Sequence, residues 1–218
     1  MTTTYPTPVT LSPSRISTFR TCPLQFRFAS IEKLPQPPQI HLVKGNFVHR
    51  VLELLLGHEP ENRSVEAARE AFELTRQEYE PSARFKALAL SPDATEAFFK
   101  DSRELVNGYY RMENPRNAKI IGLELRLDSD FGKFKLGGII DRLEYNEKNE
   151  LVVSDYKTGK PPDARFGANK MDNMHIYASL CLRERGELPK RLRLMYLKTS
   201  TPIEVEVTPE SNAACEAA

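Results

Sequence analysis

The sequence contains no tryptophan and only three cysteines among its 218 residues. Cys22, Cys181 and Cys215 are odd in number and lack CxxC spacing, which argues against a disulfide framework. Cys181 falls within a helical pattern and is expected in the core, whereas Cys215 lies on a polar C-terminal stretch.

An excess of charge is also lacking, because 31 lysines and arginines face 30 aspartates and glutamates. No global charge points to a polyanionic partner, although a local basic stripe is enough to hold phosphates. No apolar run approaches the roughly 18 residues that cross a bilayer, and the start, MTTTYPTPVTLSPS, lacks the features of a secretory signal. We therefore expect a cytoplasmic protein with no membrane partner.

What is present is typical of a globular protein, with 40% hydrophobic and 28% charged residues. The length suits one domain spanning 1–218. We expect its mainly helical part at 11–115 and its sheet core at 116–210.

Helical signals dominate the first half. Ser12 before Pro13 is typical of a helix start, and Pro23 is expected to kink or split that helix. Hydrophobic spacing predicts further helices at 44–56 and 64–79 and from about 91 onward.

After Pro115 the hydrophobic period changes from helix-like to strand-like. Strands are predicted at 120–127, 133–145 and 151–157, followed by a helix at 169–185 and strands at 191–198 and 203–207. The order is helices, three meandering strands, a helix and more strands.

The stretch GGIIDRLEYNEKNELVVSDYKTGK, residues 137–160, carries the chemistry. Side chains alternate along a strand, so Asp155 and Lys157 share a face and Tyr156 points the other way. If the two strands pair across the intervening turn, Asp141 can lie beside Asp155. Neighbouring carboxylates repel unless a cation lies between them, and a hard divalent ion such as Mg²⁺ fits that need.

Lys157 can stabilise charge that develops on a scissile phosphate, or help to orient and deprotonate a water. A metal ion would polarise the phosphoryl group, so these parts suffice for phosphodiester hydrolysis without a covalent nucleophile. A lone Asp-x-Lys is more often an ordinary strand end, and Asp141 with Arg142 could be a surface ion pair. The whole string is far more specific than the tripeptide.

GGIIDR followed by VVSDYKTGK resembles the signature of the RecB-like exonucleases within the PD-(D/E)XK nuclease superfamily, which are related to CRISPR-associated RecB-like nucleases. LSPSRISTFRTCPLQFRF and GNFVHRVLE extend the resemblance over most of residues 11–197, although 60–115 carry little of it. The resemblance implies an α/β, restriction-endonuclease-like αβββαβ core with a mixed sheet and an N-terminal helical elaboration. It also implies a metal-dependent DNA nuclease, an exonuclease acting on single-stranded DNA or free ends through metal-activated water.

The resemblance makes His49 a metal ligand together with Asp141, Asp155 and the main-chain carbonyl of Tyr156, and it makes Lys157 catalytic. In isolation, His49 would be interpreted as an ordinary histidine on an amphipathic helix. A mixed imidazole and carboxylate set suits Mn²⁺ as well as Mg²⁺, so either ion is expected as the cofactor.

Two departures from the family pattern stand out. The family's Gln-x-x-x-Tyr corresponds here to Asn173 and Tyr177, one helical turn apart; asparagine keeps the amide but is one methylene shorter, which could lower activity. Tyr177 could touch DNA, brace Lys157 or belong to the core. Many relatives bind a four-iron, four-sulfur cluster through four cysteines, and only Cys22 matches, so no iron–sulfur cluster is expected in this chain.

Several residues are left open by the sequence. Glu124 in GLELRL is either an outer metal ligand or a solvent-facing residue. Candidates for phosphate contacts, taken as a group, are Arg15, Arg20, Arg27, Arg142 and Lys160.

The expected role is DNA repair, recombination or phage/CRISPR DNA processing, with DNA and a helicase or CRISPR/repair complex as partners. A catalytically weak or inactive nucleic-acid-binding module of a larger complex is the alternative, which Asn173 and the absent cysteines favour and the intact Asp141, Asp155 and Lys157 oppose. A nuclease specific for RNA or for structured junctions is a third possibility.

Overall fold

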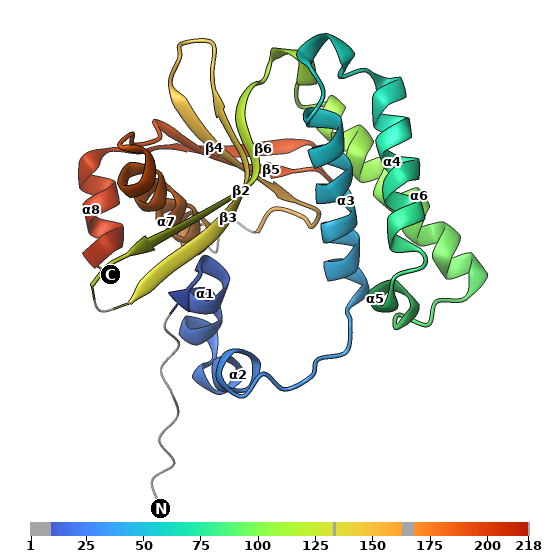
Figure 1. Ribbon diagram of the computed structural model, residues 1–218, viewed down its shortest axis with the longest axis horizontal. Coiled ribbons are helices and arrows are strands. Elements are labelled where there is room, and N and C mark those ends of the chain that lie inside the picture. Colours follow the sequence, from blue (N-terminus) through green and yellow to red (C-terminus); the bar gives the residue numbers. More distant parts are fainter. Residues whose placement is uncertain (1–9, 133, 163–167, 218) are drawn as a thin grey trace, which may run out of the picture.

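The computed structural model describes residues 10–132, 134–162 and 168–217. Within them a six-stranded mixed sheet has helices on both faces (Figure 1). The strands are β1 (Thr10–Leu11), β2 (Lys119–Asp130), β3 (Lys135–Tyr145), β4 (Leu151–Lys157), β5 (Arg191–Tyr196) and β6 (Thr201–Glu206). The helices are α1 (Pro13–Thr21), α2 (Pro23–Phe26), α3 (Ile40–Leu56), α4 (Val65–Tyr79), α5 (Ala83–Lys86), α6 (Pro92–Tyr110), α7 (Ala168–Arg185) and α8 (Pro209–Ala217).

The sheet is built from a meander and a crossover. β2, β3 and β4 pair antiparallel in chain order, and β4 then pairs parallel with β5. A parallel pair needs a long connection, which α7 supplies between β4 and β5. β6 returns antiparallel to β5, and β1 adds a short parallel contact to β3. This α3-β2-β3-β4-α7-β5 order is the restriction-endonuclease-like αβββαβ core predicted from the sequence.

Each face of the sheet carries its own hydrophobic core. On one face, α3, α4 and α6 pack over Tyr156 and Met195, and Phe47 forms edge-to-face contacts with Phe72 and Phe98. On the other face α7 packs over Leu143, Val153 and Leu194. Side chains alternate between the two faces along each strand, so neighbouring residues of β4 pack into opposite cores.

The first helix begins where the sequence predicts, after Ser12, and the helical segment is split at Pro23. Ser12 caps α1 by accepting a hydrogen bond from the Arg15 amide at 3.4 Å, and α1 stops at Thr21. Cys22 then caps α2, whose first residue is Pro23. The proline therefore splits the helix because it cannot donate the amide that a continuous helix needs.

Some elements differ from those predicted. α3 begins at Ile40, four residues before the predicted start at 44. The hydrophobic pattern did not reveal this first turn, because Ile40 and Leu42 are half exposed and contribute little to an amphipathic pattern. β1 and α8 were not predicted as elements. Cys215 lies on α8 and packs against the α7 core, which corrects its assignment to a polar tail, whereas Cys181 is fully buried as expected.

Candidate functional site

β3 and β4 bring two aspartates together at the point where the strands begin to separate. Their pairing runs as far as Arg142 opposite Ser154, so Asp141 and Asp155 come next on their strands. There the Tyr156 amide donates to Asp141 Oδ2 at 2.7 Å. A carboxylate thus takes the place of a backbone acceptor, which fixes the direction of the Asp141 side chain.

His49 reaches this point from the middle of α3. Its Nε2 lies 3.1 Å from the Tyr156 carbonyl oxygen, and its Nδ1 lies 3.4 Å from Asp141 Oδ1. The imidazole ring also packs edge-on against the Tyr156 ring, with centroids 5.8 Å apart. The histidine predicted as a ligand is therefore held between the main chain of β4 and the carboxylate on β3.

Glu124 of β2 completes the cluster. Its Oε1 is 3.9 Å from His49 Nδ1, and one ligand atom from each of His49, Glu124 and Asp141 fits within a 4.8 Å spread. The ladder between β2 and β3 is interrupted here, and Glu124 has a φ of +43°. Left-handed backbone is uncommon and strained for such a residue, and no pattern in the sequence reveals it.

The electrostatics show an excess of negative charge. Burial, reinforced by Asp141, raises the pKa of Asp155 to about 6 and that of Glu124 to about 7. Burial lowers the pKa of His49, but the hydrogen bond to Asp141 and the charges of Asp141, Asp155 and Glu124 outweigh it and bring the pKa to about 9. Carboxylates crowded in this way gain from a divalent cation, so the donor set fits a metal ion.

Lys157 lies at the end of β4 and forms an ion pair with Asp155 Oδ2. Burial lowers the pKa of Lys157, yet the charges of Asp155 and Asp141 and the hydrogen bond that Lys157 donates to Asp155 outweigh it and leave the pKa raised. The side chain is therefore an ammonium at neutral pH, 38% exposed and able to meet an anion.

The two α7 residues differ in their surroundings. Tyr177 covers Gly138 of β3, where an added Cβ would come within 2.7 Å of the ring. Burial raises the pKa of Tyr177, with smaller contributions from Asp155 and Asp141, so the hydroxyl stays protonated beside the carboxylates. Asn173 is half buried, and its side chain forms no hydrogen bond with the described residues.

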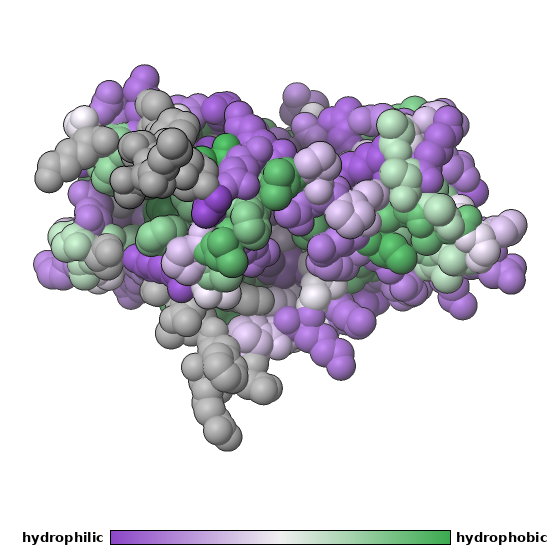
Figure 2. Space-filling view, turned by 90° about the horizontal axis from the view of Figure 1, so that it is seen from below, coloured by the Kyte–Doolittle hydropathy of each residue, from purple (hydrophilic) through white to green (hydrophobic). Residues whose placement is uncertain are grey.

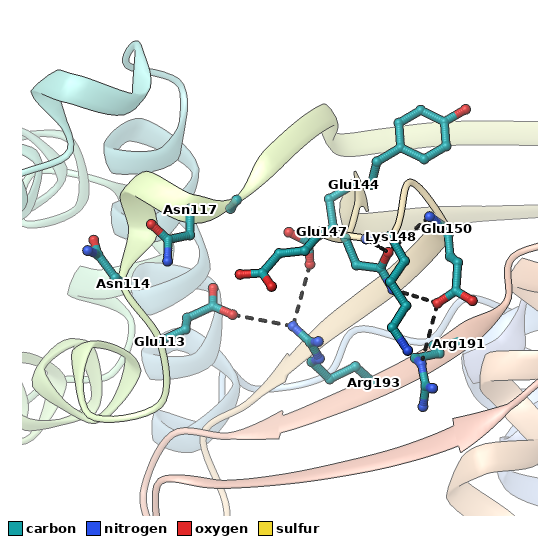
Figure 3. A pocket seen from close by; sticks show the side chains of 12 residues that line it. Glu113, Asn114, Asn117, Glu144, Glu147, Lys148, Glu150, Arg191 and Arg193 are labelled. Carbon is teal, nitrogen blue, oxygen red and sulfur yellow. Dashed lines mark hydrogen bonds and ion pairs between the residues drawn. The ribbon is translucent and has the colours of Figure 1, made fainter.

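Arg142 corrects one expectation, because it neither forms a surface ion pair with Asp141 nor can reach phosphates. Its side chain is 0% exposed on the sheet face opposite Asp141, where it pairs with Glu113 and Glu144. A cleft of about 420 Å³ lies beside this network. There the Arg193 side chain donates to Glu113 Oε2 at 3.3 Å (Figure 3). The charges of this cleft largely satisfy one another.

The other candidate phosphate contacts are scattered. Arg27 pairs with Glu32 at 2.5 Å, and Lys160 is exposed in the segment after β4. Arg15 and Arg20 line a cleft between α1 and the β2–β3 hairpin. The group predicted together is therefore not one surface.

The fold and this cluster define a class: a mixed α/β domain in which a histidine, acidic residues and a lysine meet where two central strands separate. The chain belongs to the PD-(D/E)XK nuclease superfamily, whose family model matches residues 10–216. Nucleases of this superfamily use divalent metals. The superfamily and its fold are thus confirmed, whereas the RecB-like subdivision and the relation to CRISPR nucleases stay predictions.

Among solved structures, a crystal structure from Eubacterium rectale, of a protein named "Putative exonuclease", has a TM-score of 0.59 at 10% identity, covering 96% of this chain and 76% of that one. A structure named SSO0001 has a TM-score of 0.37 at 15% identity, covering 81% and 82%. The first likeness supports the fold. No curated protein matches the chain significantly. None of the described helices is long and apolar enough to cross a membrane.

Proposed function

We propose that this protein is a metal-dependent deoxyribonuclease that hydrolyses DNA phosphodiester bonds, acting as an exonuclease. One observation carries the proposal: three potential ligands, His49, Glu124 and Asp141, converge beside the Asp155–Lys157 ion pair. Oxygen and imidazole donors next to a partly exposed ammonium suit a phosphodiester better than an uncharged substrate.

The residues that would hold Mg²⁺ or Mn²⁺ are His49, Glu124 and Asp141, with Asp155 and the Tyr156 carbonyl adjoining them. The bound ion would supply Lewis-acid polarisation of the phosphoryl group and lower the pKa of a water. Glu124 is added to the ligand set predicted from the sequence, because its carboxylate lies with the other two.

The chain's own groups supply the remaining chemistry. The Lys157 ammonium would donate hydrogen bonds to phosphate oxygens as negative charge builds up. Asp155 fixes that ammonium through their ion pair. The Tyr177 hydroxyl would donate a hydrogen bond to substrate, and Asn173 would orient substrate from one turn earlier on α7.

DNA is proposed as the substrate, single-stranded or with free ends, on the resemblance to RecB-like exonucleases. The name of the Eubacterium rectale protein agrees with an exonuclease. We further propose a role in DNA repair, recombination or phage/CRISPR DNA processing, in the cytoplasm, with a helicase or CRISPR/repair complex as a partner.

The proposal is tested by incubating the protein with end-labelled single- and double-stranded DNA and RNA in Mn²⁺, Mg²⁺ or EDTA. We expect stepwise shortening of DNA in either ion and none in EDTA. Internal cleavage would exclude exonuclease action, preferential RNA cleavage would exclude the DNA specificity, and binding without cleavage would favour the inactive module.

A further inference from the structure

A second surface, away from the metal ligands, combines aromatic rings with positive charge. We propose that this surface binds a single strand of nucleic acid by stacking its bases on Phe134 and Phe19 and by pairing its phosphates with Arg15 and Arg20. The inference rests on the proposed function, since it names how the substrate strand is held beyond the site.

The surface is a cleft of about 530 Å³ between α1, the tip of the β2–β3 hairpin, α7 and α8, which we term the aromatic cleft. Phe19 and Phe134 line it and are 53% and 38% exposed. Large rings left in water in this way mark interaction sites when they share one hollow. Figure 2 views the molecule from the side that carries α1 and the hairpin end, and shows hydrophobic side chains among hydrophilic ones.

The hairpin tip already contains a parallel stack. The Phe131 and Phe134 rings are 5.5 Å apart with an interplanar angle of 2°. The Arg183 guanidinium lies 3.8 Å from the Phe131 ring centroid and is held by Glu216 at 3.7 Å. This backing fixes the orientation of the rings, and a planar base would extend the same arrangement.

Charge complementarity favours a polyanion as the occupant. Arg15 and Arg20 both line the aromatic cleft, and neither forms an ion pair with any residue that the structure describes. Among the described residues, the Arg15 side chain donates only to the Thr10 carbonyl, at 2.8 Å, which leaves other guanidinium donors for phosphate. Arginine beside exposed aromatic rings is the combination that sequence-tolerant single-strand binders use.

The aromatic cleft continues toward the candidate active site. A neighbouring cleft of about 410 Å³ shares Leu11 and Arg15 with it and ends at Gly138 and Tyr177. Tyr177 packs against Gly138, which lies three residues before Asp141 on β3. A strand could therefore run along these two clefts from Tyr177 past Arg15 to Phe134.

The absence of tryptophan from the chain makes a direct test possible. In Phe134→Trp the new indole is the single tryptophan, and its emission should be quenched when a base stacks on it. The matched control is Leu74→Trp on α4, also an exposed position at 58%. Each variant is titrated in EDTA with a twelve-nucleotide oligothymidylate and with an abasic oligomer of the same length.

We expect quenching at position 134 by oligothymidylate, much weaker quenching by the abasic oligomer, and none at position 74. Phe134→Ala should weaken oligothymidylate binding about fivefold or more in fluorescence anisotropy. Equal quenching by both oligomers, or oligomer binding without quenching at 134, would overturn the stacking. A concentration-dependent dimer in sedimentation that Phe19→Asp dissociates, with no quenching at 134, would make the cleft a protein interface instead.

A small substrate separates this inference from the proposed function. Bis(p-nitrophenyl) phosphate contains a phosphodiester but is too small to extend from the active site to the aromatic cleft. Phe134→Ala should therefore hydrolyse it in Mn²⁺ at the wild-type rate. The same variant should degrade oligothymidylate more slowly than wild type. If the wild-type protein hydrolyses neither substrate, the proposed function fails. If Phe134→Ala matches wild type on both, the inference alone fails.

Discussion

Lys157 and Asp155 are two residues apart on one face of β4, and their ion pair couples a cation to the acidic cluster. Burial alone would favour a neutral lysine, but the carboxylates around Lys157 hold its pKa up. At the scale of the residue, the ammonium is therefore kept charged by the same groups that would bind a metal ion.

Lys157→Ala should reduce cleavage of labelled DNA by about 100-fold or more, because removing one preorganised donor to a developing oxyanion costs that much. The control is Lys190→Ala, which removes an exposed lysine paired with Glu206 at the far edge of the sheet. Wild-type turnover in Lys157→Ala, with an unchanged circular dichroism spectrum, would remove the lysine from the mechanism.

Glu124→Gln should weaken Mn²⁺ binding at least about tenfold in calorimetric titrations, on the scale seen when the surroundings of a metal ligand are altered. The amide keeps the size of the side chain but loses its charge. Glu53→Gln, one helical turn from His49 on α3, is the control. An unchanged dissociation constant would leave Glu124 outside the ligand set.

Residue roles could be predicted from the sequence only in part. The alternation of side chains along a strand is enough to place Asp155 and Lys157 on one face. The ion pair between these two side chains is seen only in the structure. The location of His49 beside Asp141 was predicted only through the resemblance, because α3 and β3 are distant in sequence. Glu124 stayed ambiguous, since its left-handed backbone arises from the local break in strand pairing.

At the scale of elements, a buried hydrogen-bond network on the sheet face opposite the site connects the two strands that carry the aspartates. Arg142 follows Asp141 on β3, and it bonds to Glu113 beyond the end of α6 and to Glu144 at 2.7 Å. Ser154, which precedes Asp155 on β4, donates to Glu144 at 3.2 Å. This network joins α6, β3 and β4 on the face opposite the site, so it sets the spacing of the two aspartates.

Glu113→Gln should lower the free energy of unfolding at pH 7 by about 2–3 kcal/mol, since Arg142 loses one of its two carboxylate partners while buried. Urea denaturation measures this. Arg193→Lys is a milder control that keeps the charge next to Glu113. A loss below about 0.5 kcal/mol would show that Glu144 alone satisfies the guanidinium.

The Glu113–Arg142 ion pair should also make the free energy of unfolding depend on pH in the acidic range. Burial raises the pKa of Glu113, but Arg142 outweighs it and leaves the pKa below the ordinary 4.5. A folded-state pKa that is depressed stabilises the protein above the unfolded value, and the stabilisation is lost as pH falls through the folded value. Glu113→Gln should therefore lose less stability than wild type between pH 6 and pH 3; equal losses would contradict the assignment.

The elements themselves were largely predictable. Strand β4 coincides with the predicted 151–157 and α4 lies within the predicted 64–79, because alternation and a serine cap are local signals. β1 is only two residues long and exists through its contact with β3, and α8 is held by packing on α7. Such elements depend on tertiary contacts that no local pattern carries.

At the scale of the whole molecule, one sheet separates two cores and the acidic cluster lies where α3 meets the strands. Crowded carboxylates store repulsion in the absence of a cation. A ligand that binds the folded state alone adds about 2.7 kcal/mol of stability at a hundredfold excess over its dissociation constant. Metal binding should therefore raise the free energy of unfolding by a measurable amount.

Mn²⁺ at such an excess should raise the thermal midpoint by about 5–10 °C, given the usual response of about 2–4 °C per kcal/mol for a domain of this size. EDTA should reverse the rise. Asp141→Asn should abolish it, whereas Asp128→Asn, an exposed aspartate paired with Arg126, should not. Equal shifts in both variants would place the bound ion elsewhere.

The placement of His49 has a consequence for the newly made chain. The imidazole belongs to residues 40–56, whereas the carboxylates and the ammonium belong to residues 119–157. The site would then assemble only when these distant portions of the chain dock against each other. An unfolded or incomplete chain would therefore lack the assembled site, because its groups come together only through tertiary folding.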